Sequence, residues 1–175
     1  MIRKKQSGFS IIELLVVMFI IVTIASLMLA NHRLGQKKYA LSQSAQRLAS
    51  DFRRAQNMAL SGVDVFSSQY YGYGVYLGKN DDFYILYGDE NNNDKYDGGD
   101  TIIETIYFPS QVEIQSLAPP PTSKKDMFFK SPDAATFIDG AGIVGGSATI
   151  ILQIKGDSSS IKTITITTAG LIQID

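Results

Sequence analysis

The chain has no cysteine, no tryptophan and a single histidine, His32, among its 175 residues. Without cysteine it cannot form a disulfide, so its folded part must be held by packing alone or with a metal. It also offers no set of cysteine and histidine ligands for a transition metal. The sequence shows no nucleophile–base–acid set and no glycine-rich phosphate loop followed by lysine. These absences predict that the protein is not an enzyme.

Charge is almost absent from the apolar run Ile11–Ala30, in which Glu13 is the only charged residue. At about 1.5 Å rise per residue, a helix of this length crosses a hydrocarbon core of roughly 30 Å. Basic flanks stay on the cytoplasmic side, so Arg3, Lys4 and Lys5 predict an inside N-terminus with the rest of the chain outside. A carboxylate in a membrane is costly unless it has a partner, which makes Glu13 a candidate functional residue.

Three interpretations of this segment remain open from the residues themselves. A secretory signal peptide has an apolar core of about 7–15 residues and a small-residue cleavage site, whereas this run is longer and Met28-Leu29-Ala30 is a weak site. A plain membrane anchor explains the length and the orientation, but not Gly8-Phe9 or Glu13. In the third interpretation, cleavage after Gly8 creates a new amino terminus that pairs with the Glu13 carboxylate.

The stretch Gly8-Phe9-Ser10-Ile11-Ile12-Glu13-Leu14-Leu15-Val16 closely resembles the processing site of type IV pilins and type II secretion pseudopilins. The resemblance implies that a prepilin peptidase cuts between Gly8 and Phe9, and that Phe9 is then N-methylated. It further implies that Glu13 pairs with the N-terminal amine of a neighbouring subunit during assembly. The physics agrees, because an amine and a carboxylate in apolar surroundings are each costly and pairing offsets both costs.

A second helical pattern follows the apolar run. Small and apolar residues recur at steps of three and four on one face, which indicates an amphipathic helix; they are Ala45, Leu48, Phe52, Ala55 and Ala59. Ser61-Gly62 predicts the helix end. The expected organisation is a leader at 1–8, a transmembrane and assembly helix at 9–30, its amphipathic continuation at 31–62 and a globular β domain at 63–175.

The globular domain is predicted to be an antiparallel sheet with one solvent-facing side, packed on the apolar stripe of the helix. Strands are expected at 70–77, 82–87, 101–108, 111–117, 127–129, 136–138, 148–155, 161–167 and 171–174. Residues 119–125, with three consecutive prolines, are expected to form an exposed, stiff loop. The fold class is therefore α+β with one or two small sheets around a long N-terminal helix, which is also what the pilin resemblance implies.

The acidic segment 89–100 lies between two predicted strands. Asp89, Asn91, Asn93, Asp97 and Asp100 occupy places one, three, five, nine and twelve of a calcium-binding loop. Two differences from the calcium-loop pattern argue against Ca²⁺ binding: the sixth place is Asp94 instead of glycine, and the last is aspartate instead of glutamate. The alternative is a solvated turn, which favours the same residue types. No cofactor is required by the sequence, and Ca²⁺ in this loop is the one candidate.

The acidic loop also resembles that of H-type minor pseudopilins and related minor pilins, as do the segments 52–59 and 137–140 and the terminal hairpin around Gly170. The resemblance implies a minor structural subunit of a type IV pilus or type II secretion pseudopilus. Its implied partners are the prepilin peptidase, other pilin or pseudopilin subunits, the inner-membrane assembly platform and the lipid bilayer. Its implied location is the bacterial inner membrane, with one pass and the globular domain outside, and then the filament.

An alternative function is a minor pilin that binds DNA or a surface. Loss of the leader removes three basic residues, which leaves 13 basic against 17 acidic residues, a net charge of −4. Non-specific DNA binding needs a basic surface. DNA binding is therefore not favoured, and it would require a local patch such as Lys124, Lys125 and Lys130.

Overall fold

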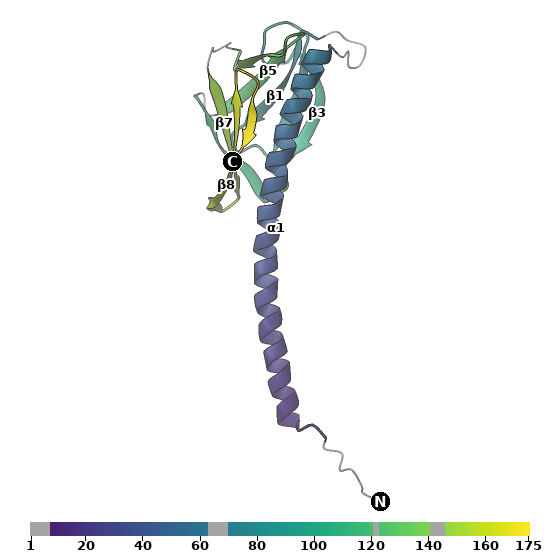
Figure 1. The fold of residues 1–175 in the computed structure, drawn as a ribbon, viewed down its shortest axis with the longest axis vertical. Coiled ribbons are helices and arrows are strands. Elements are labelled where there is room, and N and C mark those ends of the chain that lie inside the picture. Colours follow the sequence, from purple (N-terminus) through teal and green to yellow (C-terminus); the bar gives the residue numbers. More distant parts are fainter. Residues whose placement is uncertain (1–7, 63–69, 121–122, 141–145) are drawn as a thin grey trace, which may run out of the picture. The chain divides into compact units, whose positions relative to one another are not determined.

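The computed structural model of the chain describes residues 8–62, 70–120, 123–140 and 146–175, and of residues 29–33 it describes the backbone only. The predicted leader residues Arg3, Lys4 and Lys5 therefore lie outside the described part. The chain divides into two compact units, Met1–Gln36 and Lys37–Asp175, which are described separately below. Figure 1 shows helix α1 and the strands.

Helix α1 extends over Ile11–Ser61, close to the range that the sequence predicted. It begins after Ser10, whose carbonyl accepts the backbone N–H groups of Glu13 at 3.1 Å and Leu14 at 3.2 Å. It ends before Gly62, which has a φ of 58°, the left-handed conformation that glycine adopts readily at a helix end.

Nine strands follow the helix in the described part of the chain, and each corresponds to a predicted strand within a few residues. They are β1 (Gly72–Gly78), β2 (Phe83–Asp89), β3 (Thr101–Tyr107), β4 (Val112–Ala118), β5 (Lys124–Lys130), β6 (Ala135–Ile138), β7 (Ser147–Ile154), β8 (Asp157–Thr167) and β9 (Ile172–Ile174).

The strands form two antiparallel sheets. One has five strands in the order β3-β2-β1-β5-β6 and the other has four in the order β4-β7-β8-β9. The chain crosses from the first sheet to the second at Pro109-Ser110, where the backbone N–H of Val112 donates to the Pro109 carbonyl at 2.8 Å. The prediction of an α+β, pilin-like fold with one or two small sheets is confirmed.

The second half of α1 supplies the centre of the core. All five residues of the predicted stripe are fully buried: Ala45, Leu48, Phe52, Ala55 and Ala59. They belong to one apolar cluster with inward side chains from both sheets, among them Val75, Leu86, Leu117, Ile150 and Ile164. Their alternation with exposed residues explains why this half of the helix packs on the strands in Figure 1.

Two expectations about the sheet were wrong. The outer face of the five-stranded sheet is not simply solvated, because Ile85, Tyr87 and Phe128 form a second buried cluster there. The expected exposed loop at 119–125 is shorter than predicted, since β5 begins at Lys124 and Lys125 is completely buried. Residues 121 and 122 of that loop lie outside the described part. Both differences arise from side chains that cover one another across non-adjacent segments, which sequence periodicity does not report.

Candidate processing and assembly site

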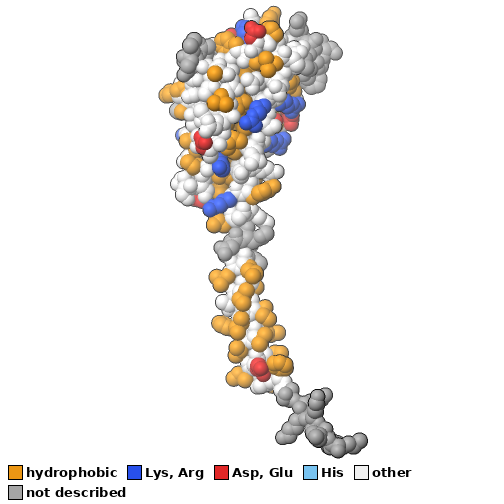
Figure 2. All heavy atoms as spheres, in the orientation of Figure 1, with side chains coloured by type: hydrophobic (Ala, Val, Ile, Leu, Met, Phe, Trp, Pro, Cys, Tyr) orange, Lys and Arg blue, Asp and Glu red, His pale blue; other side chains and the backbone are white. Residues whose placement is uncertain are grey.

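The first part of α1 exposes its apolar side chains all around. The window Ile11–Met28 has a mean hydropathy of 2.8, and none of it is buried within the structure. Figure 2 shows apolar side chains along this part of the helix. A helix that is apolar on every side and at least 18 residues long fits a membrane or a packed bundle of similar helices.

The hydroxyl groups in this segment are satisfied locally, as expected for a helix in an apolar environment. Thr23 Oγ1 donates to the Phe19 carbonyl at 2.7 Å, and Ser26 Oγ donates to the Val22 carbonyl at 2.8 Å. Glu13 is the only Asp, Glu, Lys or Arg of the window, and its side chain is exposed. The carboxylate therefore remains the one costly polar group of this window.

Gly8 and Phe9 lie just before the helix, and both are exposed. A Cβ atom added at Gly8 would meet no other atom within 4 Å, so the glycine is not required there by packing. Phe9 is 82% exposed. Accessible backbone on both sides of the bond between Gly8 and Phe9 suits a bond that a peptidase must reach.

The acidic loop is held by its own side chains. The Asp89 carboxylate is buried and accepts the backbone N–H groups of Asn91 at 2.9 Å, Asn92 at 2.7 Å and Asp94 at 3.0 Å. Asp94, the residue at the predicted glycine position, has a φ of 61°. The left-handed turn that a calcium loop requires is therefore present without glycine.

The other predicted calcium ligands turn toward one another within the loop. Asp97 accepts the Asn91 amide at 3.1 Å, and it also accepts the Asn93 amide. The backbone N–H of Gly99 and the Asn91 amide lower the pKa of Asp97, whereas burial raises the pKa of Asp100. Among the described residues no group of three or more His, Cys, Asp or Glu side chains is placed to hold a metal ion. Calcium binding stays a prediction.

The loop is fastened to the outer face of the five-stranded sheet by aromatic contacts. The Tyr96 ring lies 4.8 Å from the Tyr76 ring and 5.2 Å from the Tyr87 ring, between centroids. Buried Asp126 accepts the Tyr87 hydroxyl at 2.7 Å and the backbone N–H of Tyr96. Lys130 Nζ lies 2.9 Å from the Asp94 carboxylate. Burial is the largest cause that raises the pKa of Asp126, to about 7.

The three lysines considered for DNA binding do not form a free basic patch, which corrects that part of the alternative. Lys125 Nζ donates to the Pro119 carbonyl at 2.5 Å and to Asp139 Oδ2 at 2.6 Å, with its side chain fully buried. Lys130 is paired with Asp94, as described above. Lys124 is exposed, with its Nζ 5.8 Å from the centre of the Tyr76 ring. One exposed lysine of the three does not make the local basic patch that the DNA-binding alternative named.

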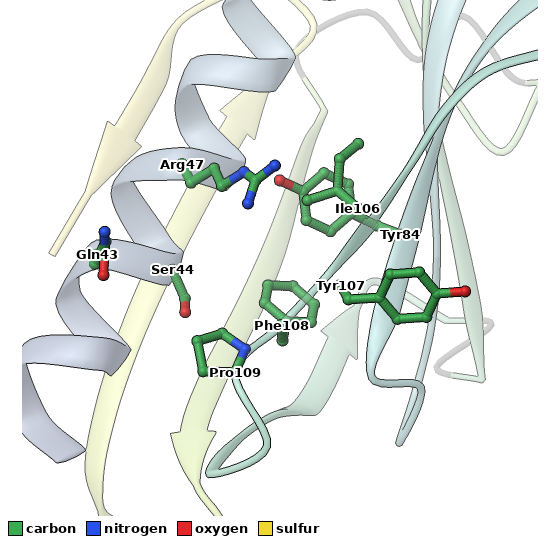
Figure 3. Close-up of a pocket in the computed structure, with 8 residues that line it drawn as sticks. All are labelled: Gln43, Ser44, Arg47, Tyr84, Ile106, Tyr107, Phe108 and Pro109. Carbon is green, nitrogen blue, oxygen red and sulfur yellow. The ribbon is translucent and has the colours of Figure 1, made fainter.

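One pocket was not anticipated from the sequence. It has a volume of about 300 Å³ and lies between the buried half of α1 and the end of β3. Figure 3 shows Ser44 and Arg47 extending from α1 toward Tyr84, Phe108 and Pro109, with Gln43 on the same helix. The Tyr84 hydroxyl donates to Asp51 at 2.5 Å; burial, followed by this hydrogen bond, raises the pKa of Tyr84. Nothing in the local sequence pattern indicated this pocket.

A comparison with known protein families found a motif in the N-terminal segment. Residues 3–29 match the prokaryotic N-terminal methylation motif. Searches of curated proteins and of solved structures gave no match. The matched motif is the N-terminal segment typical of type IV pilins and pseudopilins, and the α+β fold of the chain is pilin-like. The motif implies processing by a prepilin peptidase and assembly with other pilins, and the one N-terminal apolar helix is consistent with the inner membrane before assembly.

Proposed function

We propose that the chain is a minor subunit of a type IV pilus or type II secretion pseudopilus. In this proposal, residues 1–8 are a leader removed by cleavage between Gly8 and Phe9, and Phe9 is then methylated on its new amine. Residues 9–30 anchor the subunit and build the filament core, residues 31–62 continue the helix, and residues 63–175 form the outer domain. The observation that carries the proposal is Glu13, a lone carboxylate in an exposed apolar helical window of 18 residues.

The role of Glu13 follows from comparing lipid with a bundle of helices. The free energy of an apolar helix is almost the same in lipid as against other apolar helices. Apolar burial therefore contributes little to the free energy of moving a subunit from the membrane into the filament. An unpaired carboxylate is costly in lipid, whereas a carboxylate next to the Phe9 amine of a neighbouring subunit is neutralised. The pairing therefore favours the filament, and because the amine exists only after cleavage, unprocessed chains do not gain it.

Cleavage tests the first part of this proposal. The full chain is produced in membranes with and without a prepilin peptidase, and the N-terminal peptide is analysed by mass spectrometry. We expect loss of residues 1–8 and one added methyl group on Phe9 only when the peptidase is present. Gly8→Val should block the cut, whereas Gly35→Ala should not, although both glycines have open space where a Cβ atom would lie. A chain that stays intact with an active peptidase would refute the proposal.

Assembly tests the second part. Glu13→Val should leave membrane insertion and cleavage intact but abolish filament incorporation, because the amine of the neighbour is left without its counter-charge. Glu13→Asp keeps the charge with a shorter side chain and should retain part of the assembly. The minor role is supported by the loose resemblance of the loop and the terminal hairpin to H-type subunits. It is tested by the copy number in purified filaments, which should be far below that of the main subunit.

A further inference from the structure

The charges of the Lys37–Asp175 unit are divided between its helix and its strands. Residues 37–61 carry five basic side chains and one acidic side chain, a net charge of +4. Residues 62–175 carry seven basic and fifteen acidic side chains, a net charge of −8. One chain therefore carries a positive helix segment and a negative strand segment.

The positive surface is the outer face of α1. At 100° per residue, Arg47, Arg53 and Arg54 fall on the side opposite the buried stripe, with only uncharged residues between them. We call this set the basic face of α1; it also includes Gln43, Gln46, Ser50 and Asn57, and all seven side chains are exposed. Two carboxylates border it: Asp51 of α1, which accepts the Tyr84 hydroxyl, and Glu104 of β3, which accepts Arg54 at 2.6 Å and lies 3.8 Å from Arg47. Three guanidinium groups against these two carboxylates still leave the face positive.

The pocket described above lies beside this face and makes the surface concave there. Its lining combines Arg47 with Tyr107, Phe108 and Pro109 (Figure 3). Tyr107 is 65% exposed, and β3 pairs with no strand other than β2 in the described part of the chain. Arginine and aromatic side chains around a hollow are the composition that is enriched in protein interfaces. The basic face is therefore shaped as a contact surface as well as charged.

The negative surface is most concentrated in the acidic loop. Within residues 89–100 there are five acidic residues and one basic residue, Lys95. Lys130 neutralises Asp94 at 2.9 Å, which leaves Glu90, Asp97 and Asp100 as the acidic side chains that keep contact with solvent. The loop is held in one conformation by its internal hydrogen bonds and by the Tyr96 contacts. It therefore presents its charges at fixed positions, which lowers the entropic cost of binding.

Neighbouring positions in a filament are related by a rotation and a translation, so two adjacent copies of one chain meet through two different faces that must be complementary. We propose that the basic face of α1, with its adjacent pocket, is the docking surface for the acidic loop 89–100 of a second copy of this chain. The inference rests on the proposed filament function, and with a minor role it applies where two copies adjoin. Opposite charges select this pairing and suppress contacts between like faces.

Because the chain lacks cysteine, the contact can be tested by placing one cysteine on each face. Two differently tagged full chains, one carrying Gln46→Cys and the other Lys95→Cys, are produced together with a prepilin peptidase in membranes and then oxidised. Both positions are exposed. A control replaces Lys95→Cys by Lys155→Cys, an exposed lysine in the turn between β7 and β8. We expect a disulfide-linked heterodimer for 46 with 95 and severalfold less for 46 with 155.

Charge variants then test the cause of the contact. Ser50→Glu places a negative charge in the basic face and should reduce the cross-link severalfold, whereas Ser50→Lys, of similar size, should not. Glu90→Lys in the partner should restore the cross-link to Ser50→Glu chains. The yield should also fall at 1 M salt, where the Debye length is about 3 Å instead of about 8 Å.

The same samples distinguish this inference from the proposed function. Mass spectrometry of the N-terminus reports cleavage after Gly8, which does not depend on the docking surface. Cleaved chains that give no cross-link between 46 and 95, or give as much with 155, would overturn the docking surface and leave the proposed function standing. A cross-link that is insensitive to Ser50→Glu would also overturn it, since the contact would then not be electrostatic.

Discussion

The buried pair of Lys125 and Asp139 permits a quantitative prediction about what holds the β unit together. Lys125 is fully buried, whereas the Asp139 side chain retains 27% of its exposure, and the charged atoms lie 2.6 Å apart. Removal of one partner from a buried pair costs about 3–5 kcal/mol, because the other charge is left uncompensated. The cost within that range depends on which partner is removed, because water reaches the Asp139 carboxylate but not the Lys125 ammonium group.

Lys125→Met leaves a carboxylate that water can partly solvate and the Pro119 carbonyl without its donor. We expect a loss of about 3 kcal/mol, at the low end of the range. Asp139→Asn leaves a buried ammonium group with only neutral partners, and we expect a loss of about 4–5 kcal/mol. The double variant carries neither charge and should lose less than the more damaging single variant, which gives a large favourable coupling in a double-mutant cycle.

Urea unfolding of the full chain in detergent measures these differences, followed by near-ultraviolet circular dichroism of the nine tyrosines, because the chain has no tryptophan. For a unit of this size, 1 kcal/mol corresponds to about 4 °C in Tm, so Lys125→Met should lower it by roughly 12 °C. Lys130→Met is the control, since the pair of Lys130 and Asp94 is partly exposed and is worth about 1 kcal/mol or less. A Lys125→Met variant as stable as Lys130→Met, or strictly additive losses, would refute the reasoning.

Three further predictions concern the core, the outer face of the sheet and the acidic loop. Phe52→Ala should destabilise the unit by about 3–5 kcal/mol in the same urea assay, because Phe52 is fully buried in the centre of the helix stripe. The raised pKa of Asp126, about 7, means that the folded chain keeps a proton that the unfolded chain loses near pH 4. Stability should therefore fall as pH rises from about 4 to 7, and Asp126→Asn should flatten that slope in a pH series of melting curves. If the 89–100 loop binds Ca²⁺, millimolar Ca²⁺ should raise Tm, and Mg²⁺ at the same concentration should do so less; equal melting curves with and without Ca²⁺ would contradict the calcium prediction.

Much of the fold was predictable because its signals are local. The helix stripe depends on a period of 3.6 residues, and Ala45, Leu48, Phe52, Ala55 and Ala59 follow that period without interruption. The strands were predictable for the same reason, since β-branched and aromatic residues lie between glycine-containing and asparagine-containing turns. The processing motif is local as well, because a peptidase reads a short segment around the bond it cuts. Information that lies within one segment can be read from that segment.

The features that were missed all join distant segments. Lys125 follows three prolines and looks exposed in the sequence, but its partner Asp139 arrives only when β6 pairs with β5. Tyr96 looks like part of a polar turn, but it packs on Tyr76 and Tyr87 of two other strands. In each case a side chain is covered, completely for Lys125 and partly for Tyr96, by residues that no periodicity connects to it. Only the strand order determines which residues these are.

The burial of Lys125 and the covered outer face of the five-stranded sheet both help this β unit, which has no disulfide, to adopt one arrangement. A β unit without a disulfide must resist unfolding by packing and polar pairing alone, and apolar burial is non-directional, so it does not choose between similar arrangements. The contact between Asp126 and the loop fixes which residues cover the outer face, and the contact between Lys125 and Asp139 fixes how β6 and the 119 loop meet β5. A charged pair in the wrong register would be left unpaired at a cost of several kcal/mol, whereas an apolar pair would lose far less. These polar contacts therefore specify the arrangement of the acidic loop on the sheet, and a loop that is held in this way can present its carboxylates to a neighbouring subunit at constant positions.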